Sequence, residues 1–149
     1  MPIQIDNDET ISLKLFVVLT KAYRTVTERA IKDIKQYGLS PSEFIVLELL
    51  FTKGRFPLQQ IGEKILVTSG SITYNIDKME KKGFLIRIPC KEDRRVIYAE
   101  ITEAGNKFFN QIFPQHAATI HSILKGVSPD EKKSAIDLLK KLGKGAEEA

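Results

Sequence analysis

The stretch from residue 58 to residue 101 constrains the fold more than any other part of this chain. Apolar side chains at helical spacing predict a short helix over 58–65 and, after a turn, a second helix over about 68–82. Two runs rich in β-branched and aromatic residues, 84–90 and 96–101, then predict a hairpin. The hairpin loop, residues 91–95, reads Lys-Glu-Asp-Arg-Arg and is basic. Two helices followed at once by a hairpin with a cationic loop are the layout of a winged helix-turn-helix.

The second helix of this unit has a polar face suited to contact with DNA. At 100° per residue, Ile72, Ile76 and Met79 lie within about 60° of one another and form the face that points inward. The other face begins with small polar residues at the helix N-terminus, which can approach base edges closely in a major groove. The residues predicted to contact DNA here are Thr68, Ser69, Gly70, Ser71, Thr73, Tyr74 and Lys78. Read as structure alone, the same pattern is a solvent-exposed helix with a capped start.

The hairpin loop supplies a second set of cations. Arg94 and Arg95 lie at or just after its tip, and arginine suits a narrow minor groove, whose negative potential attracts cations. Lys91 is a further predicted contact. Asp93 does not fit a phosphate contact, so we expect it to pair with one arginine and fix the loop while the other arginine stays free. The alternative is an exposed ion pair worth about 0–1 kcal/mol and without a function.

Positive charge is concentrated in the same unit. The 149-residue chain has a net charge of +4, and residues 78–95 hold seven cations against three anions, an excess equal to that of the whole chain. After Val127, five lysines balance five acids. A local basic surface suits phosphate groups, although a solvated, lysine-rich helix end would give the same count.

Helices are predicted on both sides of this unit. Residues 10–37 carry apolar side chains at helical spacing, and 13–19 are apolar on more than one side, so this helix should pack against more than its own domain. Ser40 and Ser128 each open a helix, because each is followed by a first-turn proline and a capping-box glutamate. Thr102 caps a helix that begins at residue 103, and Pro114 should kink that helix or divide it in two. The order is four helices, two strands and two helices, a mainly α fold with a small β-hairpin wing.

Composition argues against several classes of protein. No apolar run approaches the about 20 residues of a membrane span, and the polar, acidic residues 1–8 form no signal peptide. A single cysteine, without targeting signals, indicates a reducing, cytoplasmic setting. Two histidines, no glycine-rich phosphate loop and no plausible triad argue against an enzyme, and we expect no cofactor. The remaining rival is a winged helix that binds protein in place of DNA, which would show weak salt dependence.

Three runs of the sequence resemble the MarR family of bacterial transcriptional regulators. They are residues 67–85, the wing sequence Asp93-Arg94-Arg95, and Ile101-Thr102-Glu103-Ala104-Gly105. The Gly38-Leu39-Ser40 entry to the second helix and the chain length also match, so the resemblance covers nearly the whole chain. It implies a homodimer that binds a palindromic operator, usually as a repressor released by a small ligand or by oxidation. By position, the resemblance gives the DNA-recognition role to the polar face of the helix predicted over about 68–82. It gives the wing contact to Arg94 or Arg95.

The resemblance also implies how the chain is divided. We expect one MarR-like domain over 1–149, with a winged-helix DNA-binding part at 40–102 and dimerisation helices at 10–37 and 103–143. The broad apolar surface of residues 13–19 and the matching stripe of Ile136, Leu139 and Leu142 fit such a dimer interface. In such a dimer the DNA-binding parts of the two subunits (the reading heads) must be held about one DNA turn, about 34 Å, apart. The dimerisation helices would form the rigid connection that this spacing needs.

An effector is a further implication of the resemblance. Small phenolic or aromatic acids are the usual ligands of the family, bound between the dimerisation helices and the reading part. The candidate pocket residues are Phe16, Tyr23, Phe44, Phe108 and Phe113, although the pattern of each favours plain core over a pocket. Cys90 is a candidate sensor of oxidants or electrophiles, although no neighbouring His or second Cys supports a lowered thiol pKa. His116 and His121 lie about 140° apart around a helix, so they cannot ligate one ion from the same face, and we expect no metal site.

Overall fold

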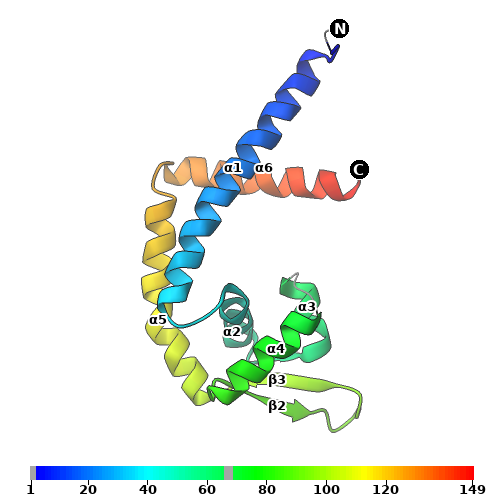
Figure 1. The fold of residues 1–149 in the computed structure, drawn as a ribbon. Coiled ribbons are helices and arrows are strands. Elements are labelled where there is room, and N and C mark those ends of the chain that lie inside the picture. Colours follow the sequence, from blue (N-terminus) through cyan, green and yellow to red (C-terminus); the bar gives the residue numbers. More distant parts are fainter. Residues whose placement is uncertain (1–2, 66–68) are drawn as a thin grey trace.

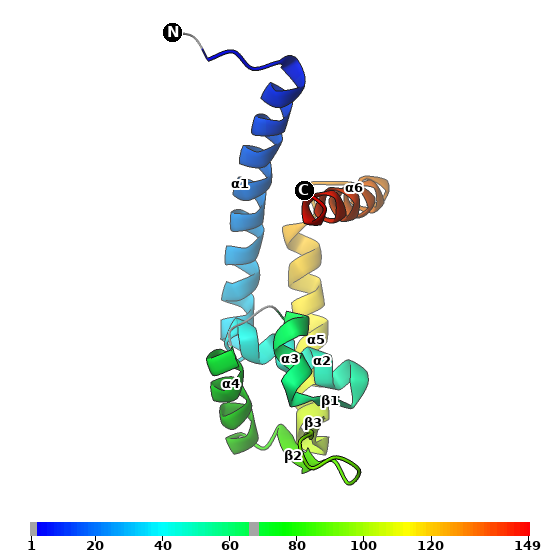
Figure 2. The same cartoon turned by 90° about the vertical axis from the view of Figure 1, so that its right-hand side faces the viewer.

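The computed structural model describes residues 3–65 and 69–149, except for the side chains of residues 65 and 69–71. Two long helices, α1 and α5, pack side by side over part of their length (Figure 1), and α6 turns away from the C-terminal end of α5, where Figure 2 shows it clear of α1. The shorter helices and a small sheet gather at the other end of the molecule (Figure 2). The elements are α1 (Asn7–Gln36), α2 (Pro41–Lys53), β1 (Arg55–Pro57), α3 (Leu58–Ile65), α4 (Ser69–Lys81), β2 (Leu85–Pro89), β3 (Ile97–Ile101), α5 (Glu103–Ile123) and α6 (Pro129–Glu147).

The expected helix starts are confirmed. The Ser40 hydroxyl accepts from the Glu43 amide at 3.1 Å, and the Glu43 carboxylate accepts from the Ser40 amide at 3.0 Å, which completes a capping box at α2. The same two bonds form between Ser128 and Glu131 at α6. Thr102 caps α5 by accepting from the Gly105 amide at 3.0 Å. These caps depend on residues three positions apart, so they form wherever the helix forms.

The sheet has three strands, one more than the sequence predicts. All pairs are antiparallel in the order β1-β3-β2, with Phe56 opposite Ala99 and Arg87 also opposite Ala99 from the other side. β1 is only three residues long and ends in a proline. It is therefore too short to show the alternation of apolar and polar residues from which a strand is predicted. It pairs because Gly54, at φ +80°, turns the chain back at the end of α2 and its carbonyl accepts from the Ile101 amide at 3.0 Å. β1 thereby makes β3 the central strand.

The core lies between α2, α3, α4, the sheet and the first half of α5. Ile72, Ile76 and Met79 are all buried, which confirms the inward face predicted for α4. The other large side chains that are fully buried include Leu47, Leu50, Ile61, Leu85 and Phe109. The part of the chain from α2 to β3, called the reading unit below, therefore shares one core with the N-terminal end of α5.

Of the two outcomes expected at Pro114, a kink or a division, division of the helix is wrong, because α5 runs from Glu103 to Ile123 as one helix. A proline removes one backbone hydrogen bond, and the burial of Phe109 and Ile112 just before it holds that part of the helix in place. Near the helix start, a side chain at Gly105 would collide with the carbonyl oxygen of Phe84. That close approach explains the glycine in the motif at residues 101–105.

Both ends of the chain leave apolar side chains uncovered. Ile11, Leu15 and Val18 on α1 are each about half exposed, and α6 exposes Ile136 and Leu139 to a similar degree. The N-terminal half of α1 stands clear of the reading unit (Figure 2). No helix within the described ranges is long and apolar enough to cross a membrane.

Candidate nucleic-acid interface

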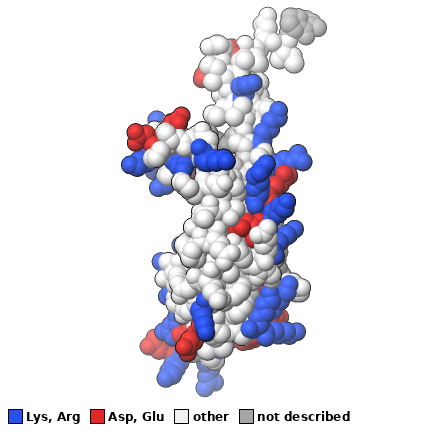
Figure 3. Space-filling model, turned by 90° about the vertical axis from the view of Figure 1, so that its left-hand side faces the viewer, with Lys and Arg blue, Asp and Glu red and all other residues white. Residues whose placement is uncertain are grey.

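The α4 helix presents a polar surface at one end of the molecule. Thr73, Tyr74 and Asp77 are exposed, on the side opposite the buried Ile76 and Met79. Ser69, Gly70 and Ser71 form the first turn of α4, and nothing further is described of their side chains, while Thr68 lies outside the described residues. Lysine and arginine side chains are frequent at this end of the molecule, with a few acids between them (Figure 3). The predicted contact residues that can be located thus share one accessible face.

Lys78 is half-buried and forms an ion pair with Glu43 of α2. Its Nζ lies 3.4 Å from a carboxylate oxygen of Glu43, and Lys82 Nζ lies 3.0 Å from the other oxygen. Burial opposes ionisation of Glu43, but hydrogen bonds from the Ser40 amide and from Lys82 outweigh it and keep the pKa of Glu43 below its usual value. The Lys78 ammonium also lies 6.0 Å from the centre of the Tyr74 ring. The buried carboxylate therefore fixes α4 on α2 through the cations at its C-terminal end.

The wing loop is ordered by Asp93. One carboxylate oxygen accepts from the Arg95 backbone amide at 3.0 Å and from the Arg95 Nε at 3.2 Å. These two bonds, the backbone one first, lower the pKa of Asp93. The arginine that pairs with Asp93 is thus Arg95, whereas Arg94 and Lys91 are exposed and have no side-chain partner within the described part of the chain.

Gln59 of α3 adds a support that sequence reasoning missed. Its side-chain amide donates to the Arg95 backbone carbonyl at 2.7 Å, across 36 positions of sequence. A glutamine on an exposed helix face carries no signal of its own, so only the fold shows this contact. It ties the wing loop to α3, the helix that precedes α4.

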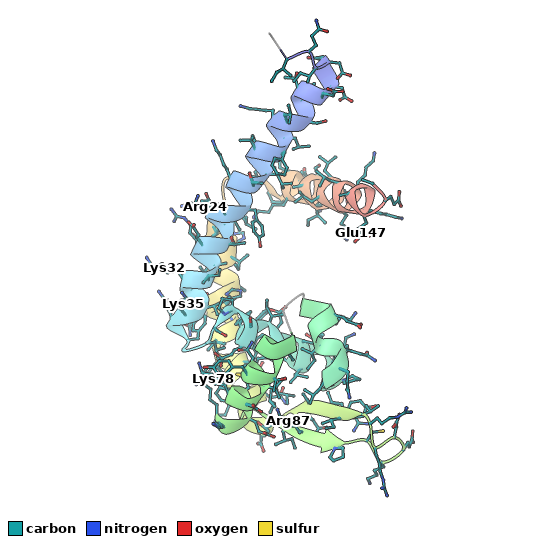
Figure 4. The ribbon with its side chains drawn as sticks, turned by 45° about the vertical axis from the view of Figure 1, so that its right-hand side comes forward. Arg24, Lys32, Lys35, Lys78, Arg87 and Glu147 are labelled. Atoms are coloured by element: carbon teal, nitrogen blue, oxygen red, sulfur yellow. The ribbon has the colours of Figure 1, made fainter. Side chains whose placement is uncertain are left out.

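Arg87 of β2 joins the wing to α4, and sequence reasoning missed this contact too. Its guanidinium bonds Asp77 at 2.6 Å and Glu80 at 2.5 Å, two acids one turn apart on α4; Figure 4 labels Arg87 at that end of the molecule. The hydrogen bond to Asp77 raises the pKa of Arg87 above its usual value, and the field of Glu80 adds to the shift, against the opposing effect of burial. The acids at positions 77 and 80 were a usable signal, because a DNA-facing helix should not carry uncompensated carboxylates. Arg87 compensates both and sets how α4 and the hairpin lie together.

The five aromatic residues named as pocket candidates do not meet in one cavity of the described chain. Phe44 is buried in the core, and Phe108 stacks on Phe84 at 4.5 Å between ring centres. Phe16 and Tyr23 are 65% and 69% exposed on α1. Phe113 packs on Phe109 and is still 43% exposed, at the edge of a groove. Within the described residues, Phe113 is therefore the candidate that borders a hollow in the single chain.

That groove, of about 470 Å³, lies between α2, α5 and α6. Besides Phe113 it is lined by Glu48, His116, His121 and Lys132, with apolar residues of α5 between them. Its chemistry combines an aromatic ring, two imidazoles and one group of each charge. A small aromatic molecule with a hydroxyl or carboxyl group matches that lining.

His116 links this groove to a buried polar cluster between α1 and α5. Its Nδ1 lies 2.9 Å from a carboxylate oxygen of the buried Asp33, and its ring packs 4.5 Å from Phe44. The same carboxylate accepts from the Thr119 hydroxyl at 3.0 Å and from the Tyr37 hydroxyl at 3.0 and 3.1 Å. Two side chains of α5 and that of Tyr37, which caps the end of α1, thus satisfy one carboxylate of α1 at the place where the long helices meet.

Cys90 lies at the end of β2, half-buried and unpaired among the described residues. It borders a hollow of about 320 Å³ together with Arg55, Lys91 and Tyr98. The Arg55 guanidinium lies over the Tyr98 ring at 4.7 Å. The thiol is thus at the base of the wing loop, at a hollow that two cationic side chains and the acid Glu92 also line, and away from the groove beside His116.

Comparison with known proteins identifies the family. Residues 39–97 match the MarR family. The chain is 50% identical over 137 residues to the HTH-type transcriptional regulator MhqR of Bacillus subtilis (strain 168), and the match spans 92% of this chain and 94% of that protein.

Solved structures share the fold. A mutant MarR from E. coli complexed with operator DNA superposes with a TM-score of 0.78 at 19% identity, covering 93% of this chain and 99% of the other. Bordetella bronchiseptica BpsR, whose DNA binding is regulated by 6-hydroxynicotinic acid, superposes with a TM-score of 0.77 at 19% identity, covering 96% and 98%. The chain therefore belongs to the MarR family of DNA-binding, winged helix-turn-helix transcriptional regulators.

Proposed function

We propose that this regulator is a repressor that binds a palindromic operator as a homodimer and is released by a small aromatic effector. The observation that carries the proposal is the joint placement of the exposed face of α4 and the wing loop that holds Arg94. Both lie at the same end of the molecule in two perpendicular views (Figures 1 and 2). A helix face for a major groove and an arginine for the adjacent minor groove can then contact one duplex together.

Dimerisation accounts for the apolar surface at the chain ends. Ile11, Leu15 and Val18 of α1 and Ile136 and Leu139 of α6 would otherwise remain in water. Burying such side chains stabilises an interface by about 25 cal/mol for each Å² removed from water. A second copy, paired through α1, α5 and α6, also supplies the second reading head that a palindrome requires.

Release by an effector is supported by the groove beside His116. A ligand there touches α2, α5 and α6 at once, and His116 bonds Asp33 of α1. The ligand can shift the spacing of the two heads only if it binds one spacing more tightly than the other. A hydroxylated aromatic acid regulates BpsR, which has the same fold. A reactive electrophile acting at Cys90 is the alternative route of release.

Selection of bound sequences from random double-stranded DNA tests this proposal. We expect a palindrome with half-sites about one turn apart to be enriched, and the enrichment to be lost when the right phenol or quinone is added. If no palindrome is enriched, the dimeric operator model is wrong. If a palindrome is enriched but no compound among a broad phenol, quinone and aromatic-acid panel displaces it, the effector part is wrong.

Arg94→Ala tests the wing contact. Log affinity for the operator should fall less steeply with log salt, by about 0.9 for each phosphate that the wing no longer neutralises and so about 1.8 for a dimer. Lys133→Ala is the matched control, because Lys133 is an exposed cation of α6 far along the chain from the reading unit. An unchanged slope in the Arg94 variant contradicts the wing assignment. Weak salt dependence of the wild-type chain would favour a protein partner over DNA.

A further inference from the structure

A second basic surface runs along α1, outside the reading unit. Five cations of this helix lie within about 80° of one another at 100° per residue, roughly opposite the face that buries Asp33 and Ile34. They are Lys14, Lys21, Arg24, Lys32 and Lys35, all exposed. Blue side chains follow the edge of the molecule formed by this helix (Figure 3), and Arg24, Lys32 and Lys35 project to one side of it (Figure 4).

The acids of this part of α1 do not neutralise the surface. Residues 10–36 contain two, Glu28 and Asp33. Glu28 pairs with Arg24 at 3.0 Å. Asp33 is buried and is hydrogen-bonded to Tyr37, His116 and Thr119. Within the described part of the chain, Lys21, Lys32 and Lys35 have no side-chain hydrogen bond or ion pair. These three ammonium groups therefore face solvent without a counter-charge on that part of the protein.

The basic surface of α1 continues onto the reading unit. Lys82, directly after α4, donates to the Gly38 carbonyl, just beyond the C-terminal end of α1, at 3.0 Å. In Figure 4, Lys78 follows Lys32 and Lys35 along the same side of the molecule. A groove of about 800 Å³ between α1 and α5 adds Arg29 and Lys125 beside Lys32. These cations form one positively charged track, which runs from Lys78 on α4 along α1 from Lys35 to Lys14.

We propose that this track binds the phosphate backbone of DNA beyond the operator half-site, so that flanking duplex adds to affinity. The proposal rests on the proposed function, because it needs the reading head to hold DNA first. From Lys14 to Lys35 the track is about 32 Å long, close to the about 34 Å of one duplex turn. A linear row of unpaired cations matches a linear row of phosphates, and backbone contacts of this kind add affinity without adding sequence preference.

The test compares two duplexes and two charge variants of the full chain. One duplex carries the selected palindrome alone, and the other carries it with about two further turns of unrelated sequence on each side. The variant Lys21→Gln/Lys32→Gln/Lys35→Gln removes three cations of the track and leaves Lys14 and the paired Arg24 in place. Lys133→Gln/Lys140→Gln/Lys141→Gln removes the same charge from the exposed surface of α6. Circular dichroism and size-exclusion chromatography check fold and assembly of both variants, since all six positions are exposed.

The wild-type chain should bind the long duplex more tightly than the short one, with a steeper salt dependence. The α1 variant should lose that gain, with a log–log slope on the long duplex smaller by about 0.9 for each lysine–phosphate pair eliminated, at most about 5 for six lysines in a dimer. Its affinity for the short duplex should stay within about twofold of wild type. The α6 variant should behave as wild type on both duplexes.

Three results would overturn the proposal. The first is equal affinity of the wild-type chain for both duplexes. The second is an α1 variant whose slope on the long duplex equals that of wild type, which would leave the track to an acidic protein partner. The third is an equal loss of affinity on both duplexes, which would place the contacts inside the operator. Absence of binding to any palindrome would instead refute the proposed function, which keeps the two failures distinguishable.

Discussion

Replacing Asp33 by asparagine tests whether the polar cluster between α1 and α5 holds these helices together. The carboxylate accepts from the Tyr37 and Thr119 hydroxyls and lies 2.9 Å from His116 Nδ1, and its side chain is only 8% exposed. An asparagine keeps the size but has one acceptor oxygen, so at least one of the three donors is left without its partner. Hydrogen bonds to a charged group contribute about 1.5–3 kcal/mol each, while the neutral amide avoids the cost of burying a charge.

The net expectation is a decrease of about 2–4 kcal/mol in the free energy of unfolding. Urea denaturation at a fixed protomer concentration measures it, because dimer stability depends on that concentration. Asp137→Asn is the matched control, since Asp137 is exposed on α6 and should change stability by less than about 0.5 kcal/mol. The reasoning fails if Asp33→Asn costs no more than that control. A cycle with Thr119→Val should further show that the two changes are not additive.

Three other changes test separate features. Gly105→Ala should cost about 1–3 kcal/mol in urea denaturation, because the added methyl group meets the Phe84 carbonyl and backbone must shift; a neutral result would contradict the close packing of α5 on the chain before β2. Burial, together with the hydrogen bond to Asp33, raises the pKa of Tyr37 from 10.0 to about 12. Its stabilising contribution should therefore be complete below pH 10 and lost as pH rises to 12, so the stability gap between wild type and Tyr37→Phe should close over that interval; a gap independent of pH would refute this. Finally, if release is non-covalent, a quinone should still displace Cys90→Ser from the operator, whereas loss of release in a mobility-shift assay would assign the effect to the thiol.

The features predicted well from sequence are those that depend on neighbouring residues. A cap such as Ser40 with Glu43 spans three positions, and the buried face of α4 follows from helical spacing alone. The pairing of an arginine with Asp93 is also local, and the structure shows that Arg95 takes this role. Local rules therefore predict the helix starts, the inward face of α4 and the order of the helices.

The features that sequence reasoning missed depend on residues brought together only by the fold. Gln59 reaches Arg95 across 36 positions, and Arg87 reaches back to two acids of α4. β1 has three residues and pairs only because Gly54 turns it against β3. Pro114 predicts a kink or a division, yet α5 is not divided, and residues just before the proline are buried in the core. Which DNA contacts and which effector residues are used stays a prediction.

The charge count shows a different limit of sequence reasoning. Residues 78–95 carry the same excess as the whole chain, which points to the reading unit alone. Residues 14–35 also hold six cations against two acids, but other parts of the chain cancel that excess in the total. Only the helix geometry reveals that Lys21, Lys32 and Lys35 share one face, apart from the buried Asp33. A regional sum of charge therefore says little until the side chains are placed on a surface.

The continuity of α5 makes it a rigid connection between the groove beside His116 and the start of the wing. Its 21 residues span about 32 Å, from Gly105 against the chain that enters the wing to the far end beside α6, with His116 in its second half. A tilt of about 5° around the middle of such a rod displaces each end by about 1.4 Å. A hydrogen bond of about 2.9 Å tolerates only a few tenths of an ångström before it weakens. If an effector binds beside His116 as proposed, a rotation of α5 by only a few degrees would therefore be enough to weaken DNA contacts at the other end.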